Sequence, residues 1–457
     1  MDALPPSDIL VRYGGNLPRY TSYPTAAQFD ASVGAAEADA WLRAVPAGTP
    51  VSLYLHVPFC DVLCLFCGCN SSVVRDADLR AAYARLLIDE LHRVAARLGA
   101  DRPVRHVQWG GGTPTTLPPD SMRAVMETVH RLFAVEADAE IAIELDPRFL
   151  PDDYPPLLGA LGFNRASLGV QDLDPEVQAA SGRVQSLQQT EDCVRRVRAA
   201  GIRSINVDLI YGLPYQTVDG AGDTALTVAE VLRPERLAVF GYAHVPWKQK
   251  RQALLPEAAL PPPAERLAQR ARIDEALRLS GYRAVGLDHY AQPDDALCHA
   301  AETGTLRRNF QGYTVDPASV LVGIGASAIS NFPQGMTQNV PANAVYARAM
   351  ETMPDSLPAV RGVCRTGNDR LRGEVIERLM CDLRVDPVAV GARHGVPAFW
   401  YDDAWPALRQ AEMDGLVVLD GPVVRVTEKG RPFLRNIASV FDAHHAPAGV
   451  KRHAGAL

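Results

Sequence analysis

The sequence predicts an α/β protein, built as an open partial (β/α)6 TIM-like barrel with an N-terminal extension and a small C-terminal winged-helix-like domain. From residue 50 onward, short β-branched or aromatic runs alternate with amphipathic helical stretches, which is the pattern of a parallel sheet covered by helices. A polar or glycine cluster follows each run, as is typical of the active-site rim of such barrels. The 457 residues, 47% of them hydrophobic, predict two or three folded domains.

Six strands and several intervening helices can be placed along the chain. Apolar residues recur every three or four positions in the helical stretches, and β-branched residues dominate the strands. Six βα units, where a closed barrel has eight, leave an opening that admits a large substrate. We predict strands at 51–57, 104–109, 140–145, 165–170, 204–210 and 236–242, helices at 77–98, 121–133, 187–200 and 264–279, and an extra strand beginning within 283–287.

We divide the chain into three regions. Residues 1–49 form an N-terminal extension that contributes to the active site, and residues 50–362 form the barrel with a cysteine loop and a substrate-side extension. Within it, the uncharged segment 317–347 predicts a core strand with loops. In residues 363–457, helices at 372–383 and 405–414 precede strands at 416–420 and 423–427. Residues 372–442 hold 9 basic and 11 acidic residues, so we expect a packing domain and no nucleic-acid interface.

The net charge and the N-terminal residues indicate where in the cell the protein is located. The formal net charge of -7 provides no global attraction to nucleic acid or to an anionic membrane. Residues 1–6 lack the basic and then apolar order of a signal peptide, and no apolar stretch is long enough to span a bilayer. We therefore expect a cytoplasmic protein with no nucleic-acid partner and no membrane insertion.

Four of the eight cysteines, Cys60, Cys64, Cys67 and Cys69, fall within ten residues. In a reducing compartment such a group indicates a metal site. A structural zinc usually takes two separated pairs of ligands, and no second pair is evident. Thiolates spaced three and then two residues apart suit one face of a [4Fe-4S] cluster whose fourth iron stays open. Iron-sulfur is the favoured prediction, and zinc is the alternative.

The polar groups at other strand ends point to a bound small molecule. The glycine run 110–112 would let the backbone approach a ligand closely, although a tight turn is an equally common use of glycine. Glu144 and Asp208 could accept hydrogen bonds from a ribose diol or an ammonium group. For both carboxylates the alternative is a buried ion pair with arginine.

The chain resembles the radical S-adenosylmethionine (SAM) superfamily in its Cys-x3-Cys-x2-Cys motif, with Phe66 before the third cysteine. The resemblance narrows to the oxygen-independent coproporphyrinogen III oxidase family through a set of runs that covers nearly the whole chain. Those runs are PRYTSYP at 18–24, YLHVPFC at 54–60, CGCN at 67–70, WGGGTPT at 109–115, ELDP at 144–147, GVQD at 169–172, DLIYGLP at 208–214 and RNFQGYT at 308–314.

Two related classes share the first three cysteines and remain alternatives. One is a haem chaperone, and the other is a haem-degrading radical methyltransferase. The chaperones typically carry an aromatic residue where Cys69 stands here. Cys69 and the run at 309–313 therefore favour the oxidase family.

The resemblance implies oxidative decarboxylation of two propionates of coproporphyrinogen III to vinyl groups, giving protoporphyrinogen IX in anaerobic haem biosynthesis. In that family a [4Fe-4S] cluster cleaves SAM to a 5′-deoxyadenosyl radical, which removes a hydrogen from an unactivated carbon. A second SAM is bound beside the first. The resemblance also implies an electron donor, such as flavodoxin or ferredoxin, and an electron acceptor that the sequence does not identify. We expect a monomer.

Matching positions assign the site residues. Cys60, Cys64 and Cys67 would hold the cluster, while Tyr54 and Cys69 would be catalytic. The first SAM would contact Tyr54, Gly111, Glu144 and the backbone of Ile329. A substrate with four carboxylates needs cations, for which Arg19 and Arg308 are candidates, with solvated surface arginines as the alternative. The second SAM would contact Phe66, Gly112, Thr113, Gln171, Arg183, Asp208 and Ala243.

Overall fold

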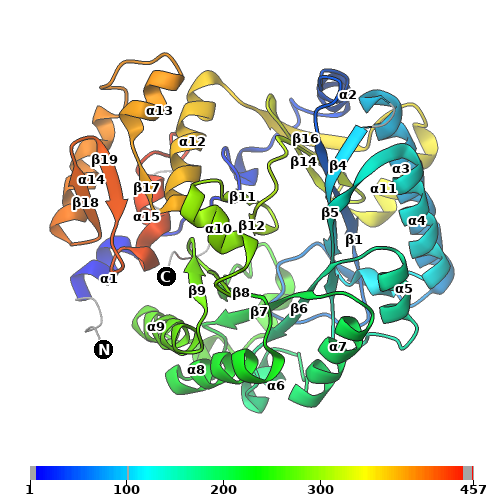
Figure 1. The fold of residues 1–457 in the computed structure, drawn as a ribbon, viewed down its shortest axis with the longest axis horizontal. Helices are drawn as coiled ribbons and strands as arrows, with labels where there is room; N and C mark the ends of the chain where they lie inside the picture. The colour runs from blue at the N-terminus through cyan, green and yellow to red at the C-terminus, as the bar shows by residue number, and fades with distance from the viewer. Residues whose placement is uncertain (1–6, 100–101, 446–454, 456–457) are drawn as a thin grey trace.

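The computed structural model describes residues 7–99, 102–445 and 455, and a sheet of twelve strands forms its centre (Figure 1). Seven neighbouring strands run parallel, and the six predicted strands are among them. This arrangement confirms the α/β fold class. In sheet order the parallel strands are β13 (Val320–Ile324), β1 (Val51–Val57), β4 (Arg102–Gly111), β5 (Phe133–Leu145), β6 (Arg165–Gln171), β7 (Ser204–Tyr211) and β8 (Arg236–Gly241).

The seventh parallel strand, β13, was not counted among the predicted barrel units. It comes from the uncharged segment 317–347, is buried along its whole length, and pairs with β1 in the register Val51↔Val320. A buried strand on the outer side of β1 explains why that segment carries no charge. Beyond β13 the sheet continues through antiparallel strands β14 (Ile329–Phe332), β15 (Gly335–Asn339) and β16 (Ala359–Cys364).

At the other edge the chain reverses direction. The strand predicted within 283–287 exists as β9 (Arg283–Val285), but it pairs with β10 (His289–Ala291), and it is β10 that pairs with β8. Within the described ranges no pairing joins β9 to β16, so the barrel is open, as predicted. A separate hairpin of β11 (Arg307–Asn309) and β12 (Gly312–Thr314) follows α10 (Ala296–Thr303).

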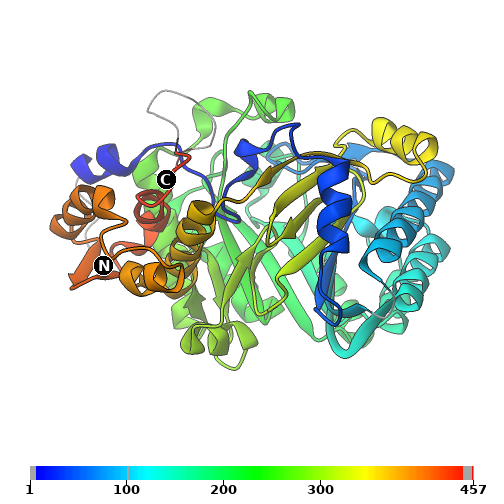
Figure 2. The ribbon, with the colours of Figure 1, turned by 90° about the horizontal axis from the view of Figure 1, so that it is seen from above.

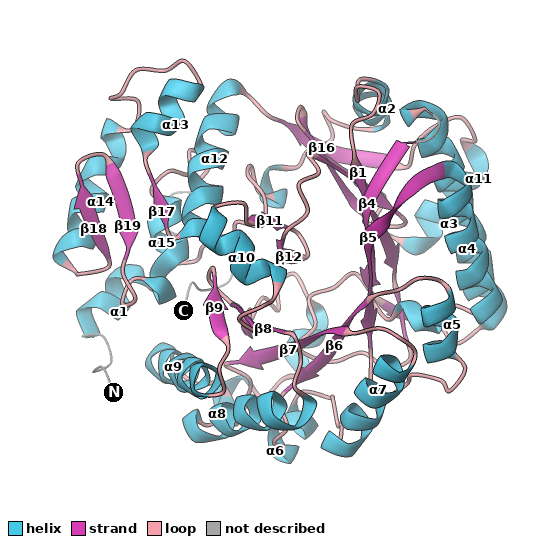
Figure 3. Ribbon diagram, in the orientation of Figure 1, coloured by secondary structure: helices cyan, strands magenta, loops and turns pink. Residues whose placement is uncertain are grey.

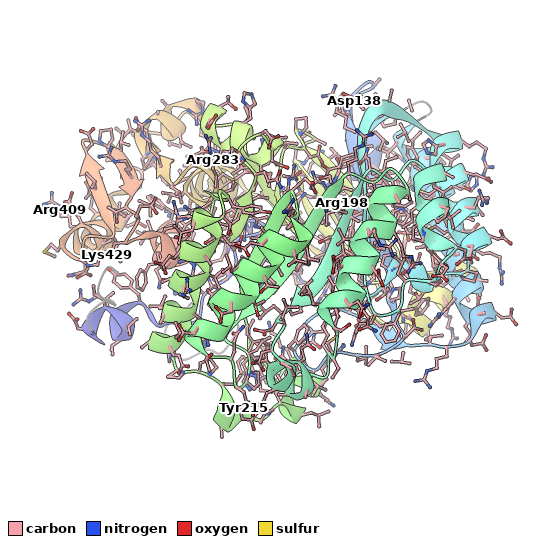
Figure 4. The ribbon with its side chains drawn as sticks, turned by 60° about the horizontal axis from the view of Figure 1, so that its bottom comes forward. Asp138, Arg198, Tyr215, Arg283, Arg409 and Lys429 are labelled. Atoms are coloured by element: carbon pink, nitrogen blue, oxygen red, sulfur yellow. The ribbon has the colours of Figure 1, made fainter. Side chains whose placement is uncertain are left out.

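Helices cover the outside of the parallel strands (Figures 3 and 4). The longest, α3, has the predicted bounds because the Asp76 carboxylate accepts hydrogen bonds from the Asp78 and Leu79 amides at its start. It ends at Gly99, whose φ of 88° favours glycine. The covering helices are α3 (Ala77–Leu98), α4 (Pro119–Leu132), α5 (Tyr154–Ala160), α6 (Pro175–Ala180), α7 (Leu187–Ala199), α8 (Val218–Thr227), α9 (Pro263–Leu279) and α11 (Asn343–Thr352).

The C-terminal region forms a second layer of helices beside a three-stranded antiparallel sheet in the order β17-β19-β18. Its helix and hairpin order agrees with the predicted elements. The elements are α12 (Gly367–Asp382), β17 (Arg384–Val385), α13 (Pro387–Arg393), α14 (Trp405–Met413), β18 (Val417–Asp420), β19 (Val423–Val426) and α15 (Leu434–Ser439). None of the described helices is both long and apolar enough to cross a membrane.

The N-terminal segment bridges the barrel and the C-terminal region. Figure 2 shows α1 (Ser7–Tyr13) beside the C-terminal region and α2 (Ala35–Arg43) against the sheet edge. Arg12 pairs with Asp414 at 2.6 Å, and the backbone of Asp30 exchanges two hydrogen bonds with Gly362. The segment between α1 and α2, which includes Arg19, is thereby held across the opening of the barrel.

Candidate active site

The carboxyl ends of the parallel strands meet at one rim, where two adjoining cavities of about 890 Å³ and 490 Å³ open. They share lining residues, including Gly111, Glu144 and Asp208. Of the residues predicted for the site, only Arg308 lies outside both linings. Those that line one cavity or both are Arg19, Tyr54, Cys60, Cys64, Phe66, Cys67, Cys69, Gly111, Gly112, Thr113, Glu144, Gln171, Arg183, Asp208, Ala243 and Ile329.

The three motif cysteines line the smaller cavity. Cys60 ends β2 (Phe59–Cys60), and Cys64 and Cys67 lie on the loop between β2 and β3 (Ser72–Val73). Within the described residues, no three His, Cys, Asp or Glu side chains stand close enough together to hold a single metal ion. Thiols spread around one cavity suit a larger iron-sulfur cluster.

Positive groups surround the cysteine loop. Arg148 and Arg183 each donate to the Cys64 sulfur, at 3.5 Å and 3.3 Å. The amide of Cys69 donates to the Cys67 sulfur at 3.4 Å, and a hydrogen bond from the Cys69 thiol lowers the pKa of Cys67 to about 6. Cations and N–H donors stabilise thiolates, which are the form that binds iron. The residues present therefore fit a [4Fe-4S] cluster.

The glycine run after β4 packs against the protein's own site residues. A Cβ at Gly111, whose φ is +109°, would lie 2.5 Å from the His56 ring, and one at Gly112 would lie 2.4 Å from the Phe59 carbonyl oxygen. The amide of Gly111 donates to Glu144 at 3.1 Å. Glycine is therefore required here for packing as well as for access to the cavity.

Glu144 and Asp208 face each other across the rim. Burial, reinforced by the charge of Asp208, raises the pKa of Glu144 to about 7, and burial raises the pKa of Asp208 to about 6. Asn206 donates to Asp208 at 2.7 Å. In the part of the chain that the structure describes, neither carboxylate lies within ion-pair distance of an arginine; Arg183, whose charge acts on Asp208, pairs with Asp146 at 3.4 Å.

The two predicted groups of SAM contacts divide in part between the cavities, although Gly111, Glu144 and Asp208 line both. Tyr54 and Ile329, from the first group, line only the larger cavity, where the Tyr54 hydroxyl lies 3.0 Å from His56 Nδ1. Members of the second group line only the smaller one: Phe66, Gly112, Thr113, Gln171, Arg183 and Ala243. Two of these have buried polar atoms without a hydrogen-bond partner, namely Gln171 Oε1 and Arg183 Nε. Such atoms indicate a site built for a polar ligand.

Arg19 lies at the junction of the cavities and lines both. Its guanidinium donates to the Gly241 carbonyl at 2.9 Å and stands 5.5 Å from the centre of the Phe240 ring. The short loop that carries Arg19 lies outside the barrel strands and places the charge of this residue at the site.

Arg308 does not reach either cavity, contrary to the expectation that it contacts the substrate. Its side chain is 3% exposed, pairs with Asp288 at 3.3 Å and stacks on Tyr313 at 4.4 Å. The β11–β12 hairpin instead presents Phe310 and Gln311 to the larger cavity. The charge of Arg308 is already paired with Asp288. Arg308 therefore supports the hairpin from the side that faces away from the cavity.

Charged residues on the inner faces of the strands were not predicted as part of the site. His106 lies 3.0 Å from Glu140, which lies 2.9 Å from Arg165, and all three line the floor of the larger cavity. The sequence signal was a set of charged residues inside otherwise apolar strands. Burial alone would raise the pKa of Glu140, but the charge of Arg165 holds it well below its usual range, so this carboxylate stays ionised.

Comparisons place the chain among known proteins. Family models match residues 54–228 (Radical SAM superfamily) and residues 366–433 (HemN C-terminal domain). A Bradyrhizobium diazoefficiens protein named oxygen-independent coproporphyrinogen III oxidase is 45% identical over 452 residues, covering 99% of this chain and 100% of the relative. An Escherichia coli protein of the same name is 40% identical over 440 residues, covering 95% and 94%. The solved structure of coproporphyrinogen III oxidase (HemN) from Escherichia coli matches with a TM-score of 0.89 at 38% identity, covering 96% of this chain and 99% of that one.

Proposed function

The chain belongs to the family of oxygen-independent coproporphyrinogen III oxidases, and we propose that it decarboxylates two propionates of coproporphyrinogen III to vinyl groups. The observation that carries this proposal is the gathering of cluster ligands, candidate SAM contacts and Arg19 around two adjoining cavities. The larger cavity, of about 890 Å³, is within the range of small-molecule sites.

The chain is a radical SAM enzyme that uses a [4Fe-4S] cluster and SAM. When bound, these groups supply the 5′-deoxyadenosyl radical that removes hydrogen from an unactivated carbon. We assign Cys60, Cys64 and Cys67 as the cluster ligands. Glu144 would accept hydrogen bonds from SAM, and the bare backbone at Gly111 would let the adenosine approach β4.

A second SAM would occupy the smaller cavity. Its support is the group of residues that line only that cavity, together with the unpartnered polar atoms of Gln171 and Arg183. Equilibrium dialysis of the reconstituted protein should give two SAM molecules per chain, and Gln171→Ala should reduce that number at the same SAM concentration. One SAM per chain in the unsubstituted protein would contradict this assignment.

Tyr54 and Cys69 would act beside the reacting groups, since both line the larger cavity. Burial raises the pKa of Tyr54 well above its usual value, so its hydroxyl stays protonated as a donor. Cys69 is exposed to the cavity and keeps its thiol proton beside Cys67. Cys69→Ser should leave iron content and SAM cleavage unchanged while lowering porphyrinogen turnover at least ~100-fold, in the range of a lost proton donor.

The remaining partners follow from the chemistry. The cluster needs an electron donor, which we propose to be a flavodoxin or ferredoxin, and the reaction needs an electron acceptor. The eight cysteines are free thiols in the structure, which fits a reducing compartment, so we propose a cytoplasmic location. We also propose that the protein acts as a monomer.

The proposed function is tested by an anaerobic assay with coproporphyrinogen III, SAM, a reductant and a cell extract, in which porphyrins are followed by mass. We expect loss of two carboxyl groups, abolished by Cys64→Ser. Cys364→Ser is the matched control because Cys364 is exposed and lies outside both cavities. Intact substrate beside a cluster that still cleaves SAM would refute the proposal. Stable haem binding without turnover would then identify a chaperone, and methyl transfer to haem a methyltransferase.

A further inference from the structure

His289 is a buried histidine in the wall of the larger cavity, and the assignments above give it no role. It is 6% exposed and lies on β10, where it pairs with Ala238 of β8, another residue of the cavity lining. Its ring packs edge-on against those of Phe240 and Tyr313, with ring centres 6.0 Å and 5.1 Å away. These contacts fix the plane of the imidazole and so the direction in which each ring nitrogen points.

One ring nitrogen of His289 is already engaged by the protein. Nδ1 lies 2.8 Å from one oxygen of the Asp288 carboxylate, and Arg308 pairs with the other oxygen at 3.3 Å. Burial alone would raise the pKa of Asp288, but the charge of Arg308 and the hydrogen bond from His289 hold it well below its usual range. An ionised carboxylate only accepts hydrogen bonds, so Nδ1 carries the proton of this contact.

The other ring nitrogen, Nε2, is the polar atom that this ring can offer to the cavity. Among the described residues, none forms a hydrogen bond with it. A Cβ at Gly312, whose φ is +131°, would lie 2.8 Å from Nε2, so this glycine of the β11–β12 hairpin keeps the nitrogen uncovered. Arg308 already balances Asp288, and a protonated ring would add a second cation beside one carboxylate. In the neutral ring Nε2 is a hydrogen-bond acceptor.

We propose that Nε2 of His289 accepts a hydrogen bond from a pyrrole N–H of coproporphyrinogen III. This inference rests on the proposed function and names a contact with the macrocycle of its substrate. Each pyrrole ring of a porphyrinogen carries an N–H group that only donates, and the methylene bridges between the rings let these groups turn toward one face. Such a donor needs an acceptor when it is buried in a cavity. SAM also carries N–H and O–H donors, so the experiment separates the two sources.

Two macrocycles with the same propionates separate an N–H contact from a carboxylate contact. Coproporphyrin III is the oxidised, planar macrocycle, and its N–H groups point into the centre of the ring, out of reach of a protein acceptor. His289→Asn keeps a donor for Asp288 but has no atom at the position of Nε2. In the reconstituted holoenzyme with SAM and without reductant, this variant should raise the dissociation constant of coproporphyrinogen III about 10-fold, as for one lost hydrogen bond, and that of coproporphyrin III under ~2-fold.

Two further variants complete the comparison. His289→Gln places an amide oxygen close to the position of Nε2 and should restore most of the affinity for coproporphyrinogen III. His394→Asn is the matched control, because His394 also bonds a carboxylate, that of Glu374 at 2.7 Å, but lies outside both cavities. Its affinities should equal those of the unsubstituted protein. If His289→Asn does not fold, His289→Phe replaces it, since a phenyl ring keeps the aromatic packing and also lacks Nε2.

Three results would overturn the inference. An equal rise for both macrocycles would show that the ring binds a carboxylate, and a rise confined to SAM would show that it binds the cofactor. An unchanged dissociation constant for coproporphyrinogen III would show no contact. Decarboxylation by the unsubstituted enzyme tests the proposed function separately. An enzyme that decarboxylates without the selective loss in His289→Asn refutes the inference alone, and one that shows the selective loss without decarboxylating refutes the proposed function alone.

Discussion

At the scale of single residues, Gly111 leaves little room for a side chain. An alanine there would carry a positive φ, which costs about 1–3 kcal/mol, and its methyl group would collide with His56. We expect Gly111→Ala to raise the dissociation constant of SAM at least ~10-fold by displacing the amide that donates to Glu144. Gly367→Ala is the control, since a Cβ there meets nothing within 4 Å. Equal SAM affinity in the two variants would contradict the packing role.

The Glu144 carboxylate predicts a pH dependence of cofactor binding. Its pKa of about 7 means that the ionised form, which accepts hydrogen bonds from hydroxyl groups, becomes dominant as the pH rises from 6 to 8. SAM should therefore bind more tightly across this window, by at most ~10-fold per pH unit. Asp208→Asn should shift the rise to lower pH by removing a neighbouring negative charge. If calorimetry gave the same pH dependence of SAM binding for Glu144→Gln, the titrating group would not be Glu144.

Arg308 should behave as a structural residue. Its removal leaves Asp288 buried without its guanidinium partner, which typically costs about 3–5 kcal/mol. We expect Arg308→Ala to lower the unfolding midpoint in denaturant strongly, whereas Arg307→Ala, at an exposed pair with Glu377, should cost under ~1 kcal/mol. Similar midpoints for the two variants would show that the Asp288 pair contributes little.

At the scale of elements, the turn after β5 reaches across to the cysteine loop. Arg148 in this turn donates to Cys64 and pairs with Asp146 at 2.7 Å. Hydrogen bonds to cluster sulfurs and nearby positive charge stabilise the reduced state. Arg148→Gln should therefore make the reduction potential of the cluster more negative, as measured by a redox titration of its EPR signal. Arg195→Gln, in an exposed ion pair on α7, should leave the potential unchanged.

The same scale shows how far the sequence predicts the fold. The strand at 51–57 and the helix at 77–98 were predicted with their observed bounds, because both are long and strongly patterned. The strands β10 and β14 have only three or four residues, too few to display a period, so their pairings could not be foreseen. The predicted bounds of β8 were close to the observed ones. Its antiparallel pairing with β10 was not predicted, because it requires the chain to reverse direction and no local residue pattern indicates this.

The site was predictable wherever one motif carried its chemistry. Cys64 and Gly111 lie in compact runs, so the cysteine spacing favours an iron-sulfur cluster over zinc, and the glycine run allows a close backbone approach or a tight turn. His106 and Arg165 come from two strands 59 positions apart, and only the fold brings both beside Glu140. Arg308 sits in a conspicuous run, yet only the fold reveals Asp288 beside it. Motif spacing therefore predicts site residues that are close in sequence. It does not predict which residues pair when they are far apart in sequence.

At the scale of the whole molecule, the second hydrophobic core joins the two ends of the chain. Ile9 on α1 is 3% exposed and belongs to the same core as α12 and α15. Ile9→Ala should cost about 2–4 kcal/mol and raise hydrogen exchange in those helices, while β1 and β4 stay protected. Val11→Ala, on the same helix but 85% exposed, should change neither. Equal exchange in both variants would show that α1 does not stabilise this core.

The pairing of β1 with β13 has a consequence for how the protein is made. Val51 lies beside Val320, 269 positions later, and the Glu90 carboxylate on α3 accepts hydrogen bonds from Gly325 at 2.7 Å and Asn339 at 2.6 Å. The strand that leads into the cysteine loop therefore keeps an open edge until most of the chain has left the ribosome. Contacts of such sequence separation form slowly. We therefore expect the strand beside the cysteine loop to reach its final pairing only after residues 320–324 have been synthesised.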